Sequence, residues 1–167
     1  SCGAFVLAQI LVCNPGLLLL ELVRPCVLKS YRNRTTTLQL LWKGLMAYVA
    51  RFSIDLMFGC ASFAGTDPDA FALPLSYMHH FHPMPEKVAV RARPELYVSM
   101  NCMAKEAIDP KEGLRAAPPL LKGYLRAGAA IGDGAVIDRQ FGTIDVFIYF
   151  PLSNIDARYK HRFGLAT

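Results

Sequence analysis

The sequence predicts an α/β fold in which helices flank a mixed sheet. Apolar segments with the composition of strands alternate along the chain with amphipathic segments of helical period. No internal repeat or low-complexity linker interrupts this alternation. The chain has 167 residues, of which 53% are hydrophobic, and this is enough to bury one sizeable core. We therefore expect a single domain over residues 1–167.

The first predicted strand covers residues 17–28, which read LLLLELVRPCVL. Such a nearly continuous apolar run is typical of a central strand that is buried on both faces. Its two charged members, Glu21 and Arg24, therefore need either a partner or a function. One interpretation is an ion pair within the strand, and the other is a role in chemistry.

The next predicted element is a helix over residues 36–51. Its apolar positions recur at helical spacing, at Leu38, Leu41, Trp42, Leu45, Met46 and Val49. Thr35 or Thr36 is placed to cap the N-terminus of this helix. We expect the helix to cover one face of the sheet.

A basic loop joins this strand to this helix. The loop contains Lys29, Arg32 and Arg34. The helix that follows directs its unpaired N–H groups and the positive end of its dipole toward the same place. Because this combination binds phosphate groups, the unit predicts a site for a phosphate-bearing cofactor such as an acyl-thioester carrier.

The remaining predicted elements continue the alternation. They are a strand over 56–62, a helix over 67–81, a proline-broken connection to about 116, a helix over 120–126 and a strand region over 135–151. Thr66 or Asp67 is the expected N-cap of the helix over 67–81. Gly132, Asp133 and Gly134 are expected to form a turn that leads into the last strand region.

The charge and the cysteine content limit the possible binding partners and the cellular compartment. The formal net charge of +5 favours an acidic partner, such as an acyl carrier protein, an anionic lipid surface or a nucleic acid. Nucleic acid fits worst, because the basic residues form no dense stripe interleaved with aromatic residues. No apolar run approaches the roughly 18 residues that span a bilayer. Five cysteines without C-x-x-C spacing indicate a reducing cytoplasm.

Two sets of side chains invite a chemical reading that we do not favour. Cys26 and Cys60 lie in predicted strands without an assigned base, so we expect packed core cysteines rather than nucleophiles. His79, His80 and His82 form a cluster, but no cysteine or carboxylate is spaced to complete a metal site with them. We therefore expect no bound metal.

Longer motifs run through almost the whole chain. E-L-x-R-x-C-V-L begins at Glu21, Y-R-x-R-T at Tyr31 and L-L-W-x-G at Leu40, and residues 58–82, 105–111 and 118–148 continue the series. In this order the motifs resemble the ornithine N-acyltransferases of bacterial ornithine-lipid synthesis, some of which are called hemolysin-like, within the GNAT superfamily of N-acyltransferases. Glu21 and Arg24 are also placed as in the E-L-x-R signature of acyl-homoserine-lactone synthases.

This resemblance implies a GNAT-like fold whose N-terminal strands are missing from the chain. It also implies an activity, the transfer of a (3-hydroxy)acyl group to the α-amine of ornithine, which gives lyso-ornithine lipid. The implied donor is the phosphopantetheine thioester of acyl carrier protein, and no permanently bound cofactor is implied. The expected location is the cytoplasm, with peripheral contact at the inner face of the bacterial membrane left open.

The resemblance assigns roles to particular residues. Glu21 is the candidate base or amine-binding group, and Arg24 would orient Glu21 or hold a substrate carboxylate. The residues implied around the pantetheine arm and its phosphate are Cys26, Val27, Leu28, Arg32, Asn33, Arg34, Thr35 and Thr36.

Two positions depart from the family pattern E-L-G-R-S-C-V. Val23 stands where the family usually has glycine, and Pro25 stands where it usually has serine. Proline has no N–H group, so a hydrogen bond donated from that position cannot form. The alternative to an enzyme is therefore an inactive fragment that retains at most binding to acyl carrier protein or to a membrane surface.

Overall fold

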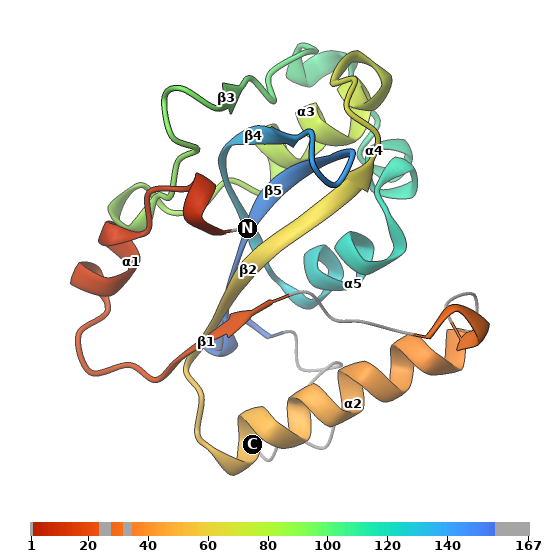
Figure 1. The fold of residues 1–167 in the computed structure, drawn as a ribbon. Helices are drawn as coiled ribbons and strands as arrows, with labels where there is room; N and C mark the ends of the chain where they lie inside the picture. Colours follow the sequence, from red (N-terminus) through yellow and green to blue (C-terminus); the bar gives the residue numbers. More distant parts are fainter. Residues whose placement is uncertain (1, 24–27, 32–34, 156–167) are drawn as a thin grey trace.

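The computed structural model describes residues 2–23, 28–31 and 35–155 (Figure 1). These residues form a five-stranded mixed sheet in the order β1-β2-β5-β4-β3 with flanking helices. The strands are β1 (Leu19–Leu22), β2 (Leu56–Ala64), β3 (Tyr97–Val98), β4 (Ala130–Asp138) and β5 (Thr143–Pro151). The α-helices are α1 (Ala8–Cys13), α2 (Thr35–Arg51), α3 (Ala72–Phe81), α4 (Pro110–Ala116) and α5 (Pro119–Ala127). This architecture confirms the predicted α/β class and is consistent with a GNAT-like fold.

Six short 3₁₀ helices complete the described elements. They are η1 (Cys2–Ala4), η2 (Lys29–Tyr31), η3 (Asp69–Phe71), η4 (Glu86–Val88), η5 (Lys105–Ala107) and η6 (Leu152–Asn154). None of the helices in the described ranges has the length and apolar character that a bilayer crossing requires.

The unit β1–α2–β2 has the topology that the sequence predicts. β1 and β2 pair in parallel, with Leu19 opposite Leu56 and Leu22 opposite Gly59, and α2 connects them. The two backbones come very close at Gly59, where an added Cβ would lie 2.6 Å from the carbonyl oxygen of Leu22. Only glycine fits this approach, so Gly59 determines how tightly β1 joins the sheet.

β1 differs from the strand predicted over residues 17–28. It spans four residues, and within the described part of the chain it is the edge strand of the sheet rather than a central strand. The prediction of burial on both faces is wrong, because Leu17, Leu18 and Glu21 are exposed.

The sheet separates two apolar clusters. The larger cluster lies on the side of the helices and includes Trp42 and Met46 of α2, Leu75 of α3 and Leu121 of α5. The smaller one gathers residues of the N-terminal segment and of the connection after α3, including Phe5 and Val90, against strand residues such as Phe147. The sheet is therefore covered on both faces, by α2, α3 and α5 on one and by the N-terminal segment with α1 and the connection after α3 on the other (Figure 1).

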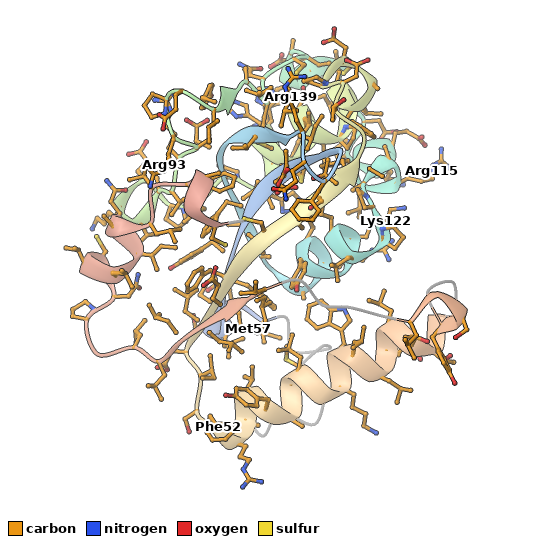
Figure 2. All side chains as sticks on the ribbon, viewed as in Figure 1. Phe52, Met57, Arg93, Arg115, Lys122 and Arg139 are labelled. Carbon is orange, nitrogen blue, oxygen red and sulfur yellow. The ribbon has the colours of Figure 1, made fainter. Side chains whose placement is uncertain are left out.

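The N-terminal segment is fixed to the connection after α3 by hydrogen bonds. Val6 N donates to Arg91 O at 2.9 Å, and Arg93 N donates to Ala4 O at 2.9 Å. The Arg93 side chain lies beside this segment in Figure 2 and donates from Nε to Gly3 O at 2.7 Å. Hydrogen bonds as well as apolar contacts thus hold the N-terminal segment on this side of the sheet.

Two predicted helices are found with shifted starts. The helix predicted over 67–81 is divided into η3 and α3, and α3 begins at Ala72 because Pro74 is tolerated only in a first turn. Asp67 supports the start of η3 by accepting a hydrogen bond from Asp69 N at 3.1 Å. The helix predicted over 120–126 is confirmed as α5.

The strand region predicted over 135–151 is a hairpin of β4 and β5. Asp138 Oδ1 accepts hydrogen bonds from Gln140 N and Phe141 N, each at 3.0 Å, and so shapes the turn between these strands. The turn predicted at 132–134 is wrong, because these residues lie inside β4 at a register shift between Ile131 and Ala135. A bulge uses the same glycines as a turn, since Gly134 has φ of +81°.

Candidate functional site

Glu21 lies on β1, opposite Phe58 of β2. It is exposed, and its carboxylate lies next to the thiol of Cys2. Its neighbours Leu20 and Leu22 pack against the larger cluster, on the helix side of the sheet. Because side chains alternate along a strand, Glu21 points to the other face. Its proposed partner Arg24 lies outside the described residues.

Two thiols meet beside Glu21. The Sγ atoms of Cys2 and Cys60 are 3.4 Å apart, and both cysteines are free thiols. The hydrogen bond to Cys60 raises the pKa of the Cys2 thiol above its ordinary value, and burial and the Glu21 carboxylate add to this effect. Cys2 is thus held neutral and is a poor nucleophile. Cys60 packs against the smaller cluster, as the sequence predicts for a core cysteine.

The predicted phosphate site has the expected backbone frame. The 3₁₀ helix Lys29–Tyr31 precedes α2, and α2 begins at Thr35, one residue earlier than predicted. Leu28 and Thr36 are exposed on either side of this junction. The other residues implied around the cofactor, Cys26, Val27, Arg32, Asn33 and Arg34, lie outside the described residues. The arrangement of side chains at this site stays a prediction.

A pocket of about 360 Å³ lies between α2, α5 and the end of β1. It is lined by Leu22, Val23, Leu38, Leu41, Trp42, Leu45, Leu120 and Tyr124. We call it the α2–α5 pocket. Its size falls within the range of about 300–1,000 Å³ that is usual for small-molecule sites, and its lining is almost wholly apolar.

Regular helical spacing builds the walls of this pocket. On α2 the lining residues follow the pattern i, i+3, i+4 and i+7, and on α5 they are four residues apart. Trp42 and Tyr124 bring the two helices together with ring centroids 4.9 Å apart in an edge arrangement. Burial raises the pKa of Tyr124 to about 12, which keeps its phenol neutral.

The α2–α5 pocket was not predicted from the sequence. The apolar stripe of α2 was expected to pack wholly against the sheet, whereas Leu41 is exposed and Met46 and Val49 are buried. The stripe from Leu38 to Val49 covers about three helical turns, and its pattern does not show which part faces the sheet and which part faces another helix. The partner wall could not be identified, because nothing in the sequence pairs α5 with α2.

The histidines at the end of α3 and directly after it make local contacts. His80 Nε2 donates to the carbonyl oxygen of Met103 at 2.9 Å, and His82 Nε2 lies 2.8 Å from the hydroxyl of Tyr77. Burial lowers the pKa of His82. Among the described residues, no group of three or more His, Cys, Asp or Glu side chains is arranged to hold a metal ion.

Comparison with known proteins gives one consistent result. No family model matches the chain, and no solved structure matches it. Three similar relatives are each named L-ornithine N(alpha)-acyltransferase and come from Rhizobium meliloti (strain 1021), Brucella abortus (strain 2308) and Agrobacterium fabrum (strain C58). They are 48%, 50% and 43% identical to this chain over 164 residues.

The matches differ in how much of each protein they include. They cover 98% of this chain but only 55%, 58% and 56% of the three relatives. The chain therefore spans a little more than half the length of the curated relatives that it matches. Over the matched residues the chain is thus similar to proteins named L-ornithine N(alpha)-acyltransferase.

Proposed function

We propose that this protein is an N-acyltransferase that transfers a (3-hydroxy)acyl group to the α-amine of ornithine. The observation that carries the proposal is the 41–50% identity to four relatives named for this activity. The proposed donor is the phosphopantetheine thioester of acyl carrier protein, and the proposed product is lyso-ornithine lipid. The parallel unit β1–α2–β2 supports the donor, because a helix N-terminus follows a basic loop there.

The chemistry is a direct acyl transfer without an acyl-enzyme. The neutral α-amine attacks the thioester carbonyl carbon, so a C–N bond forms and the C–S bond breaks. Glu21 accepts the proton that the nitrogen loses, and the departing thiolate takes up a proton to become the thiol. Glu21 suits this role because it is an exposed carboxylate on β1, the strand that leads toward the predicted cofactor site.

The charge of the chain supports a carrier protein as donor. Acyl carrier proteins are acidic, and the formal net charge of +5 favours their approach. The same charge favours an anionic membrane surface, where a lipid product would be released. We accordingly propose action in the cytoplasm at or near the inner face of the bacterial membrane.

The test is a steady-state assay with acyl-loaded carrier protein and ornithine, with the N-acylated product measured by mass spectrometry. Glu21→Gln should lower kcat by roughly 10²-fold or more, because a positioned base contributes about 10²–10⁴. Glu95→Gln is the matched control, since Glu95 is exposed and distant in the chain from β1. Equal rates for the wild type and Glu21→Gln would remove Glu21 from the mechanism.

A second candidate function is binding without catalysis. Pro25 favours it, because a proline in the segment after β1 cannot donate a backbone hydrogen bond to a thioester oxygen. In that case the chain would bind carrier protein bearing phosphopantetheine and form no amide. The assay above separates the two candidates, since only the enzyme gives product.

A further inference from the structure

The α2–α5 pocket has a lining suited to hydrocarbon. Six of its eight lining residues are leucine or valine, and the polar atoms of the other two are the indole nitrogen of Trp42 and the hydroxyl of Tyr124. An apolar cavity of about 150 Å³ holds one benzene molecule, so a cavity of about 360 Å³ holds roughly a dozen carbon atoms. The size suits one alkyl chain of medium length.

The position of the pocket relates it to the proposed reaction. It begins at Leu22 and Val23, directly after Glu21 and directly before the segment that leads to the predicted phosphate site. Side chains of neighbouring strand residues point to opposite faces. An alkyl chain in the pocket would therefore approach β1 from the helix side, while the polar amine would approach from the side of Glu21.

The chemistry of the lining selects among possible occupants. A pantetheine arm or a peptide would bring amide groups into the pocket, and unpaired amides are costly to bury. An alkyl chain brings no polar group and gains from burial of its surface. The occupant that fits both the lining and the family is the tail of the transferred acyl group.

Trp42 forms the wall between this pocket and Gly123 of α5. It is 8% exposed, it lines the pocket, and it touches Gly123, which does not line it. A Cβ at Gly123 would lie 3.3 Å from Nε1 and 3.4 Å from Cζ2 of the indole. Phe150 also contacts the indole of Trp42, with ring centroids 6.4 Å apart in an edge arrangement. A methyl group at position 123 would press the indole toward the cavity.

We propose that the α2–α5 pocket binds the alkyl chain of the acyl donor, and that Gly123 sets the longest chain accepted by fixing the position of the Trp42 indole. This inference rests on the proposed N-acyltransferase function and adds a determinant of acyl chain length. Gly123 acts as a positioning residue, since it works through Trp42.

The test uses fatty-acid binding, which does not depend on turnover. Octanoic, dodecanoic and hexadecanoic acids are titrated into the wild-type chain by calorimetry. Gly123→Ala should weaken binding of the two longer acids by roughly tenfold or more and leave octanoic acid nearly unchanged. Gly44→Ala is the matched control, because a Cβ at Gly44 of α2 meets nothing within 4 Å, and this variant should bind all three acids as the wild type does.

Two further variants keep the proposal testable if Gly123→Ala folds poorly. Trp42→Phe should enlarge the pocket and shift the preference toward hexadecanoic acid. Leu41→Asp places a carboxylate at an exposed position of the lining and should abolish binding of all three acids while the chain stays folded by circular dichroism.

The outcomes separate this inference from the proposed function. Absence of fatty-acid binding, or equal affinities for Gly123→Ala and the wild type, would overturn the inference even if ornithine is acylated. Selective loss of the longer acids in a chain that acylates no ornithine would support the pocket and count against the proposed function.

Discussion

Tyr124 links the α2–α5 pocket to stability at high pH. Burial raises its pKa from 10.0 to about 12, so the folded state disfavours the phenolate. The stabilisation is fully present below about pH 10 and is lost as pH rises to about 12. The difference corresponds to roughly 2–3 kcal/mol.

We predict that Tyr124→Phe removes this part of the pH dependence. Urea unfolding of the wild type between about pH 9 and pH 12 should show a steeper fall in the free energy of unfolding than the same series for Tyr124→Phe. Parallel curves for the two proteins would mean that Tyr124 is accessible to water in the folded state. Other tyrosines contribute equally to both curves and cancel in the comparison.

Among the structural elements, β1 depends most directly on a single position. A Cβ at Gly59 would lie 2.6 Å from the carbonyl oxygen of Leu22. This oxygen belongs to the backbone, so it cannot move away as easily as the end of a flexible side chain. We predict that Gly59→Ala separates β1 from β2 and destabilises the chain by roughly 1–3 kcal/mol. Hydrogen exchange should become faster at Leu19–Leu22 than in the hairpin of β4 and β5.

The same substitution in α2 provides the contrast. Gly44 has open space around its missing side chain, and alanine is the better helix former by about 1 kcal/mol. Gly44→Ala should therefore leave exchange in β1 unchanged and raise the melting temperature slightly. A loss of β1 protection in both variants would show that the close approach at Gly59 is not the cause.

Sequence reasoning worked best for elements that local pattern determines. α2, α5 and β2 were predicted within one or two residues, because helical period, proline at a helix start and an apolar run are local signals. β1 was predicted too long, since edge position depends on which strands pair and not on composition. The glycines at 132–134 suited a turn and a bulge equally, and only pairing with β5 decides between them.

The candidate site was predictable in part for the same reason. Glu21 could be singled out as a charged residue in an apolar strand, and the start of α2 could be located from its threonines. The contact of Cys2 with Cys60 spans 58 positions of the chain, and the pocket requires α5 to meet α2. Neither of these long-range contacts produces a periodic pattern in the sequence from which it could be predicted.

For the whole molecule, the two faces of the sheet have different proposed tasks. The helix side holds the α2–α5 pocket, and the other side presents Glu21 next to Cys2. In the sequence, the basic loop follows Glu21 and precedes α2. We expect affinity for the carrier protein to depend on this loop, and preference for acyl chain length to depend on the pocket. Substitutions in one should therefore have little effect on the other.

We predict that joint replacement of Arg32 and Arg34 by alanine weakens binding of carrier protein that bears phosphopantetheine by roughly tenfold. The affinity for carrier protein without the phosphopantetheine group should fall much less, because the phosphate is the proposed contact of the loop. Surface plasmon resonance with both forms measures the difference. Equal losses would indicate general charge attraction instead of a phosphate site.

The central claim is that this protein acylates the α-amine of ornithine. The most direct measurement is nuclear magnetic resonance of ornithine labelled at its α-nitrogen, incubated with the protein and acyl-loaded carrier protein. The account predicts that an amide proton signal attached to the labelled nitrogen appears with the protein and does not appear without it. Persistence of the free α-amine, or acylation of the side-chain nitrogen instead, would contradict it.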